Sequence, residues 1–471
     1  MDTLQLQPLR WTLLWPEDAE QVNRAGNCLD GGYRHAASIQ SLFYLPGTIS
    51  QRLAIAEQFN RTDEPFPTAS FARQALERSG ADSHYGFDES DGIWTIRSRS
   101  PADFSARPGG GPMRVYLEGP AGVQSFRLDS TQVRPFLALI ETLGGATSLD
   151  AICALAEAHS LQGLLGMLAS DAMVTMGRAS AAPDVASLPE FLYFGHSSFA
   201  VRDGATLVAF DPVCLPGNDR APDGRSMIAI LRAAAFIVIS HHHWDHLHLQ
   251  TLCRLPRDTR FVVPRTGVAS WSNPPMAAYL RSLGFHRILE CTAGDVLDLD
   301  GVILRCFPFR GEPFGLDSRF DGVTLHVAFG THTLFASVDA WANEDGDMEA
   351  VIEQVARLGS PELFLAGASG QFHPRPCAAA GLRHFSNELQ ARPDLIRYHP
   401  TMEDAQRWCA VLKPRVMIPY ADFSFSKRGA RDLDFHALTG PGPGCRTPVR
   451  LAPLQGIRWG GHGLERVKKP P

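Results

Sequence analysis

The sequence predicts an α/β fold, and the stretch that indicates this most clearly lies in the second half of the chain. The apolar run 233–239 (AAAFIVI) ends in β-branched residues, which is typical of a buried strand. The polar segment 240–246 (SHHHWDH) follows it directly. In open α/β sheets, functional sites form where a central strand ends and a loop begins. Glycine and proline are abundant, at 42 and 34 residues, as expected of a loop-rich α/β protein.

The segment 240–246 carries candidate metal ligands in the pattern His-x-His-x-Asp-His. Imidazole nitrogen and carboxylate oxygen together suit zinc, iron or manganese. Because side chains alternate along an extended segment, His241 and His243 can share one ion, while Asp245 and His246 turn towards a second. The alternative is a solvated histidine-rich loop or an affinity tag, but a tag would be terminal and would lack the aspartate. We therefore predict a site for two metal ions.

The same segment resembles the signature of the metallo-β-lactamase fold superfamily. A second stretch supports this resemblance, because residues 194–201 (FGHSSFAV) and 207–212 (LVAFDP) are similar to the opening strands of that fold. The resemblance covers residues 188–455 approximately and implies an αββα sandwich. It implies that His196 lies on a strand pointing towards the site and that Asp211 ends a strand near the metal loop. Both side chains could then orient the metal ligands.

The resemblance also implies ligands on later strands. A strand at 302–307 is followed by PFRGE, where hydrolases of the superfamily carry a histidine. Glu312 is the nearest ionisable group that could serve instead, although Arg310 could simply pair with it on the surface. The strand 333–337 leads into Val338 and Asp339, and Asp339 matches the bridging aspartate of the superfamily. A carboxylate at that position can span two cations and screen their repulsion.

The last ligand is left open. Residues 415–422 (RVMIPYAD) resemble the final core strand of the superfamily, and Ala421 stands where hydrolases usually place a histidine. Asp422 is the first candidate because it is adjacent, with His373 and His399 as alternatives. A loop aspartate that caps the following turn is an equally good explanation of Asp422.

The ligand pattern resembles that of the diiron β-hydroxylases that act on amino acids tethered to nonribosomal peptide carrier proteins. This implies an oxygenase with two metal ions. Iron is favoured because hard oxygen ligands stabilise its oxidised state, with zinc or manganese as alternatives. Asp245 and Asp339 would be catalytic, and the substrate would be small or tethered to a carrier or peptide. The competing hypothesis is a zinc- or manganese-dependent hydrolase of an ester, lactone, amide or phosphodiester. A third is a metal-bearing scaffold that has lost catalysis and only binds a partner.

The sequence predicts two further regions before a catalytic domain at 186–455. Residues 1–108 form an α+β region, and the Gly/Pro-rich stretch 101–112 marks its end. Residues 109–180 combine strands at 113–117 and 123–128 with helices at 133–143, 148–159 and 161–170, a pattern that resembles a winged-helix module. Such a module could dock a carrier or peptide. Packing or dimerisation is an equally weighted alternative, since the docking idea rests on analogy of fold.

Composition restricts the remaining hypotheses. A length of 471 residues suggests two or three domains. The net charge of −6 gives no indication of nucleic-acid binding, and no apolar run is long enough to span a membrane. The first residues lack the features of a signal peptide, and the nine cysteines include no Cys-x-x-Cys pair. We therefore expect a cytoplasmic protein without a disulfide framework, and we predict no oligomeric state.

Overall fold

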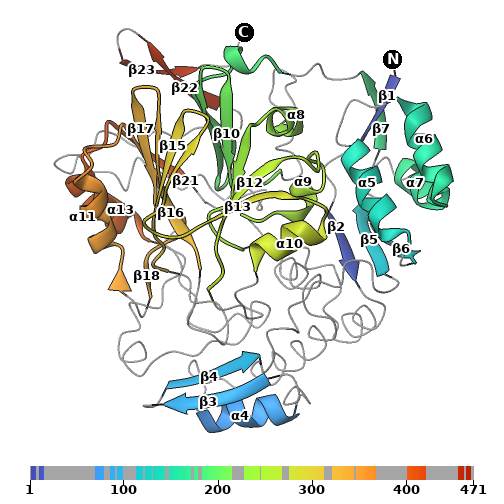
Figure 1. Cartoon of the computed structure of the whole chain (residues 1–471), viewed down its shortest axis with the longest axis horizontal. Helices are drawn as coiled ribbons and strands as arrows, with labels where there is room; N and C mark the ends of the chain where they lie inside the picture. Colours follow the sequence, from blue (N-terminus) through green and yellow to red (C-terminus); the bar gives the residue numbers. More distant parts are fainter. Residues whose placement is uncertain are drawn as a thin grey trace.

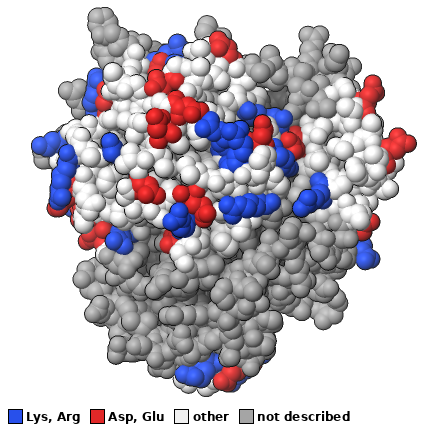
Figure 2. Space-filling view, in the orientation of Figure 1, with Lys and Arg blue, Asp and Glu red and all other residues white. Residues whose placement is uncertain are grey.

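Two β-sheets packed face to face form the body of the molecule (Figure 1). The computed structural model describes residues 2–6, 10–14, 69–78, 85–90, 93–98, 113–119, 122–129, 131–143, 148–170, 174–178, 183–214, 227–243, 246–267, 275–311, 321–343, 346–367, 400–420, 455–460 and 463–467. Within these residues, no helix combines the length and the apolar character needed to cross a lipid bilayer. On the face shown in Figure 2, basic and acidic side chains are interspersed rather than separated by sign.

The first sheet has eight strands in the order β13-β12-β11-β10-β9-β8-β22-β23. Its strands are β8 (Phe191–Gly195), β9 (Ser198–Asp203), β10 (Thr206–Phe210), β11 (Phe236–Val238), β12 (Arg260–Pro264), β13 (Arg287–Cys291), β22 (Gln455–Gly460) and β23 (Gly463–Val467). Strands β10, β11, β12 and β13 run parallel to one another. Their carboxyl ends therefore meet at one edge, where Asp211 follows β10 and the histidine segment follows β11.

The second sheet has six strands in the order β14-β15-β16-β17-β20-β21. These are β14 (Val296–Leu299), β15 (Val302–Pro308), β16 (Val323–Phe329), β17 (His332–Ala336), β20 (Leu363–Gly367) and β21 (Val416–Tyr420). The predicted hairpin around Asp300 and Gly301 is present as the antiparallel pair β14 and β15. Strands β17, β20 and β21 are parallel, so Asp339 lies just beyond the end of β17, beside the ends of its neighbours.

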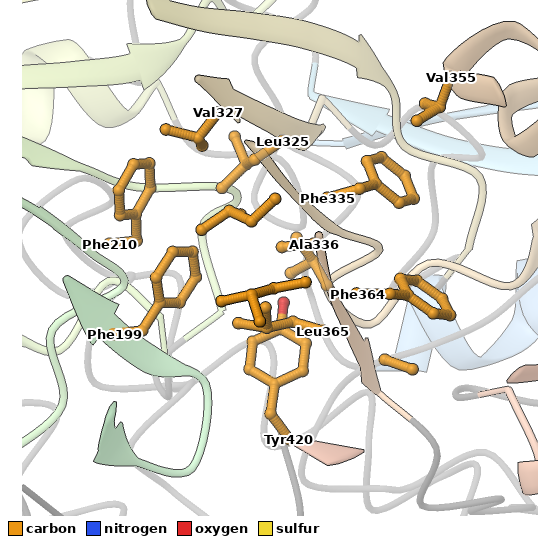
Figure 3. Close-up of a cluster of buried hydrophobic side chains, with 14 of the residues drawn as sticks. Phe199, Phe210, Leu325, Val327, Phe335, Ala336, Val355, Phe364, Leu365 and Tyr420 are labelled. Carbon is orange, nitrogen blue, oxygen red and sulfur yellow. The ribbon is translucent and has the colours of Figure 1, made fainter. Parts of the chain in front are cut away.

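Alternating side chains of the two sheets fill the space between them (Figure 3). On β10, Val208 and Phe210 face the second sheet, while Leu207 and Ala209 face the opposite way. Successive side chains of a strand point to opposite faces, so a strand covered on both faces buries apolar side chains on each. The outer face of the first sheet packs against α8 (Met227–Arg232), α9 (Leu249–Leu252) and α10 (Met276–Ser282). The second sheet packs against α11 (Glu349–Ala356) and α13 (Met402–Leu412). The predicted αββα sandwich is confirmed.

The helical part of the N-terminal region packs onto the same body. It contains β5 (Met113–Gly119), β6 (Gly122–Leu128), α5 (Val133–Leu143), α6 (Leu149–Ala158) and α7 (Gln162–Ser170), as the sequence predicted. β1 (Asp2–Leu6) pairs with β7 (Val174–Arg178), and β2 (Arg10–Leu14) pairs with β5. The start of the chain therefore completes the sheets of this part. The predicted domain boundaries and the winged-helix resemblance stay predictions.

A separate hairpin lies between these elements in the sequence. It consists of β3 (Tyr85–Ser90) and β4 (Ile93–Ser98) and is preceded by α4 (Ala69–Arg78). The short pair β18 (Ala342–Asn343) and β19 (Gly346–Asp347) and a turn of 3₁₀ helix at Val185–Ser187 complete the described elements.

Candidate metal centre

Asp211 joins the ends of the two central parallel strands. Its side chain is 1% exposed, and its Oδ1 accepts a hydrogen bond from the backbone N–H of Ser240 at 2.7 Å. Its Oδ2 accepts a second bond from the Ser240 hydroxyl at 2.6 Å. Charge-assisted bonds of this kind are short and strong in a buried setting. Asp211 therefore fixes the point at which the histidine segment leaves β11.

The same network fixes the orientation of two histidine rings. His246 Nδ1 lies 2.8 Å from Asp211 Oδ2, and a carboxylate can only accept, so this nitrogen carries the proton. The Ser240 hydroxyl donates to Asp211 and can therefore accept from His241 Nδ1, which lies 2.9 Å away. With both Nδ1 atoms acting as donors, the Nε2 lone pairs are directed at the opposite side of the rings. Histidines that bind metals are held in this way.

The Nε2 side of these rings meets Asp339 from the second sheet. His246 Nε2 lies 2.8 Å from Asp339 Oδ2, and His241 Nε2 lies 4.0 Å from the same oxygen. His241 Nε2 also lies 3.0 Å from His243 Nδ1. Ligand atoms of His241, His246 and Asp339 all lie within 4.8 Å of one another, so these three side chains form a group that can hold one cation.

The charges of the cluster also favour a cation. His246 is flanked by two carboxylates, Asp211 and Asp339, each 2.8 Å from one of its nitrogens. Both carboxylates and the His246 ring are at most 1% exposed. Buried carboxylates at this density need a compensating positive charge, which a metal ion held by His241, His246 and Asp339 would provide. The described residues therefore fit a bound metal ion.

Three residues around the cluster have left-handed backbone conformations. They are His196 (φ 51°), Asp211 (φ 43°) and Val338 (φ 55°). Such conformations are uncommon for residues other than glycine and concentrate at functional sites. His196 lies in the turn after β8 and not on a strand, which corrects the expectation from the sequence. Its ring is buried, with its centroid 6.1 Å from that of His246.

The structure brings together only part of the predicted ligand set. His241, His243, His246 and Asp339 are adjacent, and Asp211 contacts His246. The other candidates, Asp245, Glu312 and Asp422, and the alternatives His373 and His399, lie outside the described residues. The assignment of all these residues as metal ligands, and the site for a second ion, stay predictions.

The described residues next to Glu312 lie against the site. The Phe309 ring centroid is 5.1 Å from that of His241. A Cβ atom placed on Gly311 would come within 2.7 Å of the Trp341 backbone nitrogen, so this segment packs directly on the chain that follows Asp339. Only glycine allows such a close approach. The segment that ends at Gly311 and the chain that follows Asp339 are therefore in contact one residue before Glu312.

The sequence did not single out Ser240, Gly367 or Tyr420 at this site. Ser240 stands in the motif but is not itself a ligand type. Gly367 and Tyr420 are paired neighbours at the ends of β20 and β21, and a contact between separate strands leaves no signal in the spacing of one chain. A Cβ on Gly367 would collide with the Val338 carbonyl oxygen and lie 3.3 Å from Asp339 Oδ1.

Comparisons with known proteins agree with this architecture. Residues 190–307 match the family model described as beta-lactamase superfamily domain. The region includes β8 to β12 and the histidine segment, so the fold recognised from 194–212 and 240–246 is confirmed.

Two groups of relatives share sequence with the chain. It is 30% identical over 168 residues to the 4-amino-L-phenylalanyl-[CmlP-peptidyl-carrier-protein] 3-hydroxylase of Streptomyces venezuelae, which is 34% of this chain and 31% of the relative. It is 33% identical over 130 residues to the uncharacterized protein Rv0906 of Mycobacterium tuberculosis, which is 25% of this chain and 32% of the relative. The chain thus spans about a third of the length of these relatives.

A solved structure extends the similarity of fold to most of the chain. CmlA, described as a diiron beta-hydroxylase from Streptomyces venezuelae, superposes with a TM-score of 0.56 at 16% identity, covering 89% of this chain and 90% of that one. A mutant form of the CmlA beta-hydroxylase gives a TM-score of 0.55 and covers 89% and 92%. At this identity the likeness describes the fold. With 89% of the chain covered, it extends well beyond residues 190–307.

Proposed function

We propose that this protein is a dinuclear-metal enzyme, a non-haem diiron oxygenase that hydroxylates a small substrate or one tethered to a carrier protein or peptide. The observation that carries the proposal is the 30% identity over 168 residues to a hydroxylase whose name specifies an aminoacyl group on a peptidyl carrier protein. The similarity of fold to CmlA over 89% of the chain supports it.

The chemistry of the site is compatible with this proposal. His241, His246 and Asp339 would hold one ion, and His243, Asp245, Glu312 and Asp422 are the proposed further ligands. When bound, two iron ions would supply the activation of dioxygen. Hydroxylation inserts one oxygen atom of O₂ into a C–H bond and reduces the other to water, with two electrons and two protons from an external reductant. Oxygen ligands such as Asp339 and Glu312 suit iron that cycles through oxidised states.

The protein's own contribution would be orientation and shielding. Asp211 and Ser240 hold the imidazoles of His241 and His246 with Nε2 towards Asp339. All of these residues are at most 1% exposed, and His241 and His246 have no exposed surface. A site closed to water on this side limits unproductive loss of oxidising equivalents. Among the described residues of the cluster, His243 is partly exposed, so we propose that a substrate approaches from its side.

A metallo-hydrolase is the second candidate because one observation favours it. Three of the ligands that the structure brings together are imidazoles, which zinc prefers. A hydroxide held by two zinc or manganese ions would then attack an ester, lactone, amide or phosphodiester.

Metal analysis of the purified wild-type protein separates these functions. We expect two irons per chain, an optical spectrum of oxidised iron, and oxygen uptake after reduction. Stoichiometric zinc without oxygen uptake would reject the oxygenase and favour the hydrolase. Weak, substoichiometric binding of every metal tested would favour a scaffold that has lost catalysis.

A further inference from the structure

The backbone at Asp211 adopts a conformation that its local sequence disfavours. Asp211 has a φ of 43°, in the left-handed region, and Pro212 follows it. A proline biases the residue before it towards extended conformations, and residues other than glycine rarely adopt a positive φ. Such a turn persists only where contacts from surrounding structure hold it.

The neighbouring strand places Ser198 opposite this turn. β9 and β10 are antiparallel, and their pairing ends with Phe199 and Phe210, whose rings stack with centroids 4.5 Å apart (Figure 3). The same register places Ser198 opposite Asp211, one position further along. Ser198 is also paired with Gly195 of β8, so its own backbone is held from the other side.

The Ser198 hydroxyl bridges the peptide groups on the two sides of Pro212. It donates a hydrogen bond to the Asp211 carbonyl oxygen and accepts one from the Val213 backbone N–H at 2.7 Å. Pro212 itself has no N–H with which to support the turn. Ser198, Asp211 and Val213 are all at most 2% exposed. A side chain therefore takes over at the point where the backbone pairing of β9 and β10 ends.

We propose that Ser198 is a positioning residue for the metal centre. Its hydroxyl holds the Asp211 backbone in the left-handed turn, and the Asp211 carboxylate in turn accepts hydrogen bonds from Ser240 and His246. Ser198 acts through Asp211 and contacts neither metal nor substrate. The inference rests on the proposed function only in requiring that His246 is a metal ligand, and it applies equally to an oxygenase and a hydrolase.

Cobalt binding tests this role without reference to turnover. Apo protein is titrated with Co²⁺ in competition with a chelator, and the visible spectrum of the cobalt protein is recorded. For Ser198→Ala we expect cobalt affinity to fall by about tenfold, the lower end of the range for groups that orient metal ligands, and the visible bands to shift. Thr206→Val is the matched control and should leave both unchanged. The Thr206 hydroxyl also donates to a backbone carbonyl, that of Asp300 at 3.0 Å, but at the opposite end of β10.

A double-mutant cycle with Asp211→Asn distinguishes positioning from a general loss of stability. If Ser198 acts through Asp211, Ser198→Ala should change cobalt affinity by less than about threefold once the carboxylate has been replaced. Equal losses in both backgrounds, or a wild-type affinity in Ser198→Ala, would overturn the positioning role while leaving the proposed function intact. A wild-type protein that binds no cobalt at all would overturn both.

Ser198→Cys keeps the test decisive if Ser198→Ala does not fold. A thiol is a weaker donor and acceptor than a hydroxyl, so the two hydrogen bonds should weaken and not disappear. We expect the cobalt affinity of Ser198→Cys to fall by at least about threefold, a loss that Asp211→Asn should again abolish. A wild-type affinity in a folded Ser198→Cys protein would likewise overturn the positioning role.

Discussion

At the scale of single residues, the site depends on side chains that are not themselves metal ligands. Asp211 accepts two hydrogen bonds from Ser240 and one from His246, and all three groups are buried. Each bond fixes a ring or a loop end that would otherwise rotate. The arrangement of the metal-binding nitrogens therefore depends on the Asp211 carboxylate as much as on the histidines themselves.

We predict that Asp211→Asn weakens metal binding. The amide has nearly the same shape, but its NH₂ group is a donor and cannot accept. In either orientation of the amide, the bond from the Ser240 backbone or the bonds from the Ser240 hydroxyl and His246 are lost, so His246 is held less firmly. Metal affinity should fall by about 10–100-fold. Asp203→Asn is the control, since Asp203 accepts only a backbone N–H of Gly330 at 2.9 Å, away from the histidines. Unchanged affinity in Asp211→Asn would show that Asp211 does not orient His246. Chelator competition measures both variants.

A second prediction concerns the pH dependence of stability and rests on His326. Burial, with a smaller effect of its cross-strand neighbour Arg305, lowers the pKa of His326 from 6.5 to about 4. The unfolded chain therefore binds a proton below pH 6.5 that the folded chain does not bind until about pH 4. Stability is fully present above pH 6.5 and falls between pH 6.5 and pH 4, by up to about 3 kcal/mol.

Urea unfolding across this pH range tests the role of His326. His326→Leu should remove most of the acid sensitivity between pH 6.5 and pH 4. His159→Gln should not, because His159 is exposed at the end of α6. If wild type and His326→Leu lose stability equally over this range, the loss arises from other groups.

At the scale of elements, α5 belongs to the same hydrophobic core as the outer face of the first sheet. Phe136, Leu139 and Ile140 on α5 form one buried cluster with Leu252 and Leu255. Polar contacts reinforce the junction, because the Arg257 guanidinium donates to the Leu137 carbonyl at 2.9 Å and pairs with Glu141 at 3.3 Å. The helical part therefore packs against the sandwich, and the role of this region stays a prediction. A docking role stays a prediction.

The ion pair at this junction gives an element-scale prediction. Glu141→Ala removes the pair with Arg257 and an acceptor for the Arg257 backbone N–H at 3.3 Å. Both side chains are about three quarters buried, at 21% and 25% exposed, so we expect a loss of about 1–2 kcal/mol. Asp300→Asn removes the charge of the more exposed pair with Arg260, whose side chains are 32% and 53% exposed, and keeps a residue type that tolerates the φ of 56° at this position, so it should cost clearly less than Glu141→Ala. Urea unfolding compares them, and equal losses would mean that the junction contributes no more than surface contacts.

The sequence predicted elements better than their pairing. The helix 133–143 and the hairpin around 300–301 follow local rules of periodicity and turn chemistry, and both are present at the predicted positions. The pairing of β1 with β7 joins residues more than 160 positions apart and has no local signature. At the site, by contrast, the sequence alone indicated the histidine segment, because its residues are close together in the chain. The close approach of Gly367 to the Val338 carbonyl oxygen depends on the parallel order of β17, β20 and β21, which only the fold reveals.

At the scale of the whole molecule, the sandwich brings together strand ends from both sheets. Asp211 follows β10, and the histidine segment follows β11. Asp339 follows β17, and Gly311, which follows β15, lies beside the chain that follows Asp339. The metal chemistry therefore depends on which residues follow each strand end. Glu312, directly after Gly311, stays the predicted substitute for the histidine that the resemblance implies after β15. This one position is the sharpest distinction between the two proposed functions.

We predict that Glu312→His shifts the protein from iron towards zinc. An imidazole replaces a hard anionic oxygen with a softer nitrogen, so total metal binding should survive while the iron-to-zinc ratio and the oxygen uptake both fall by at least about tenfold. Glu353→His, on the exposed face of α11, is the control and should change neither. If Glu312 only pairs with Arg310 at the surface, the substitution would cost about 0–1 kcal/mol of stability and leave metal content unchanged. Elemental analysis and oxygen uptake of wild type and both variants, purified side by side, decide between these outcomes.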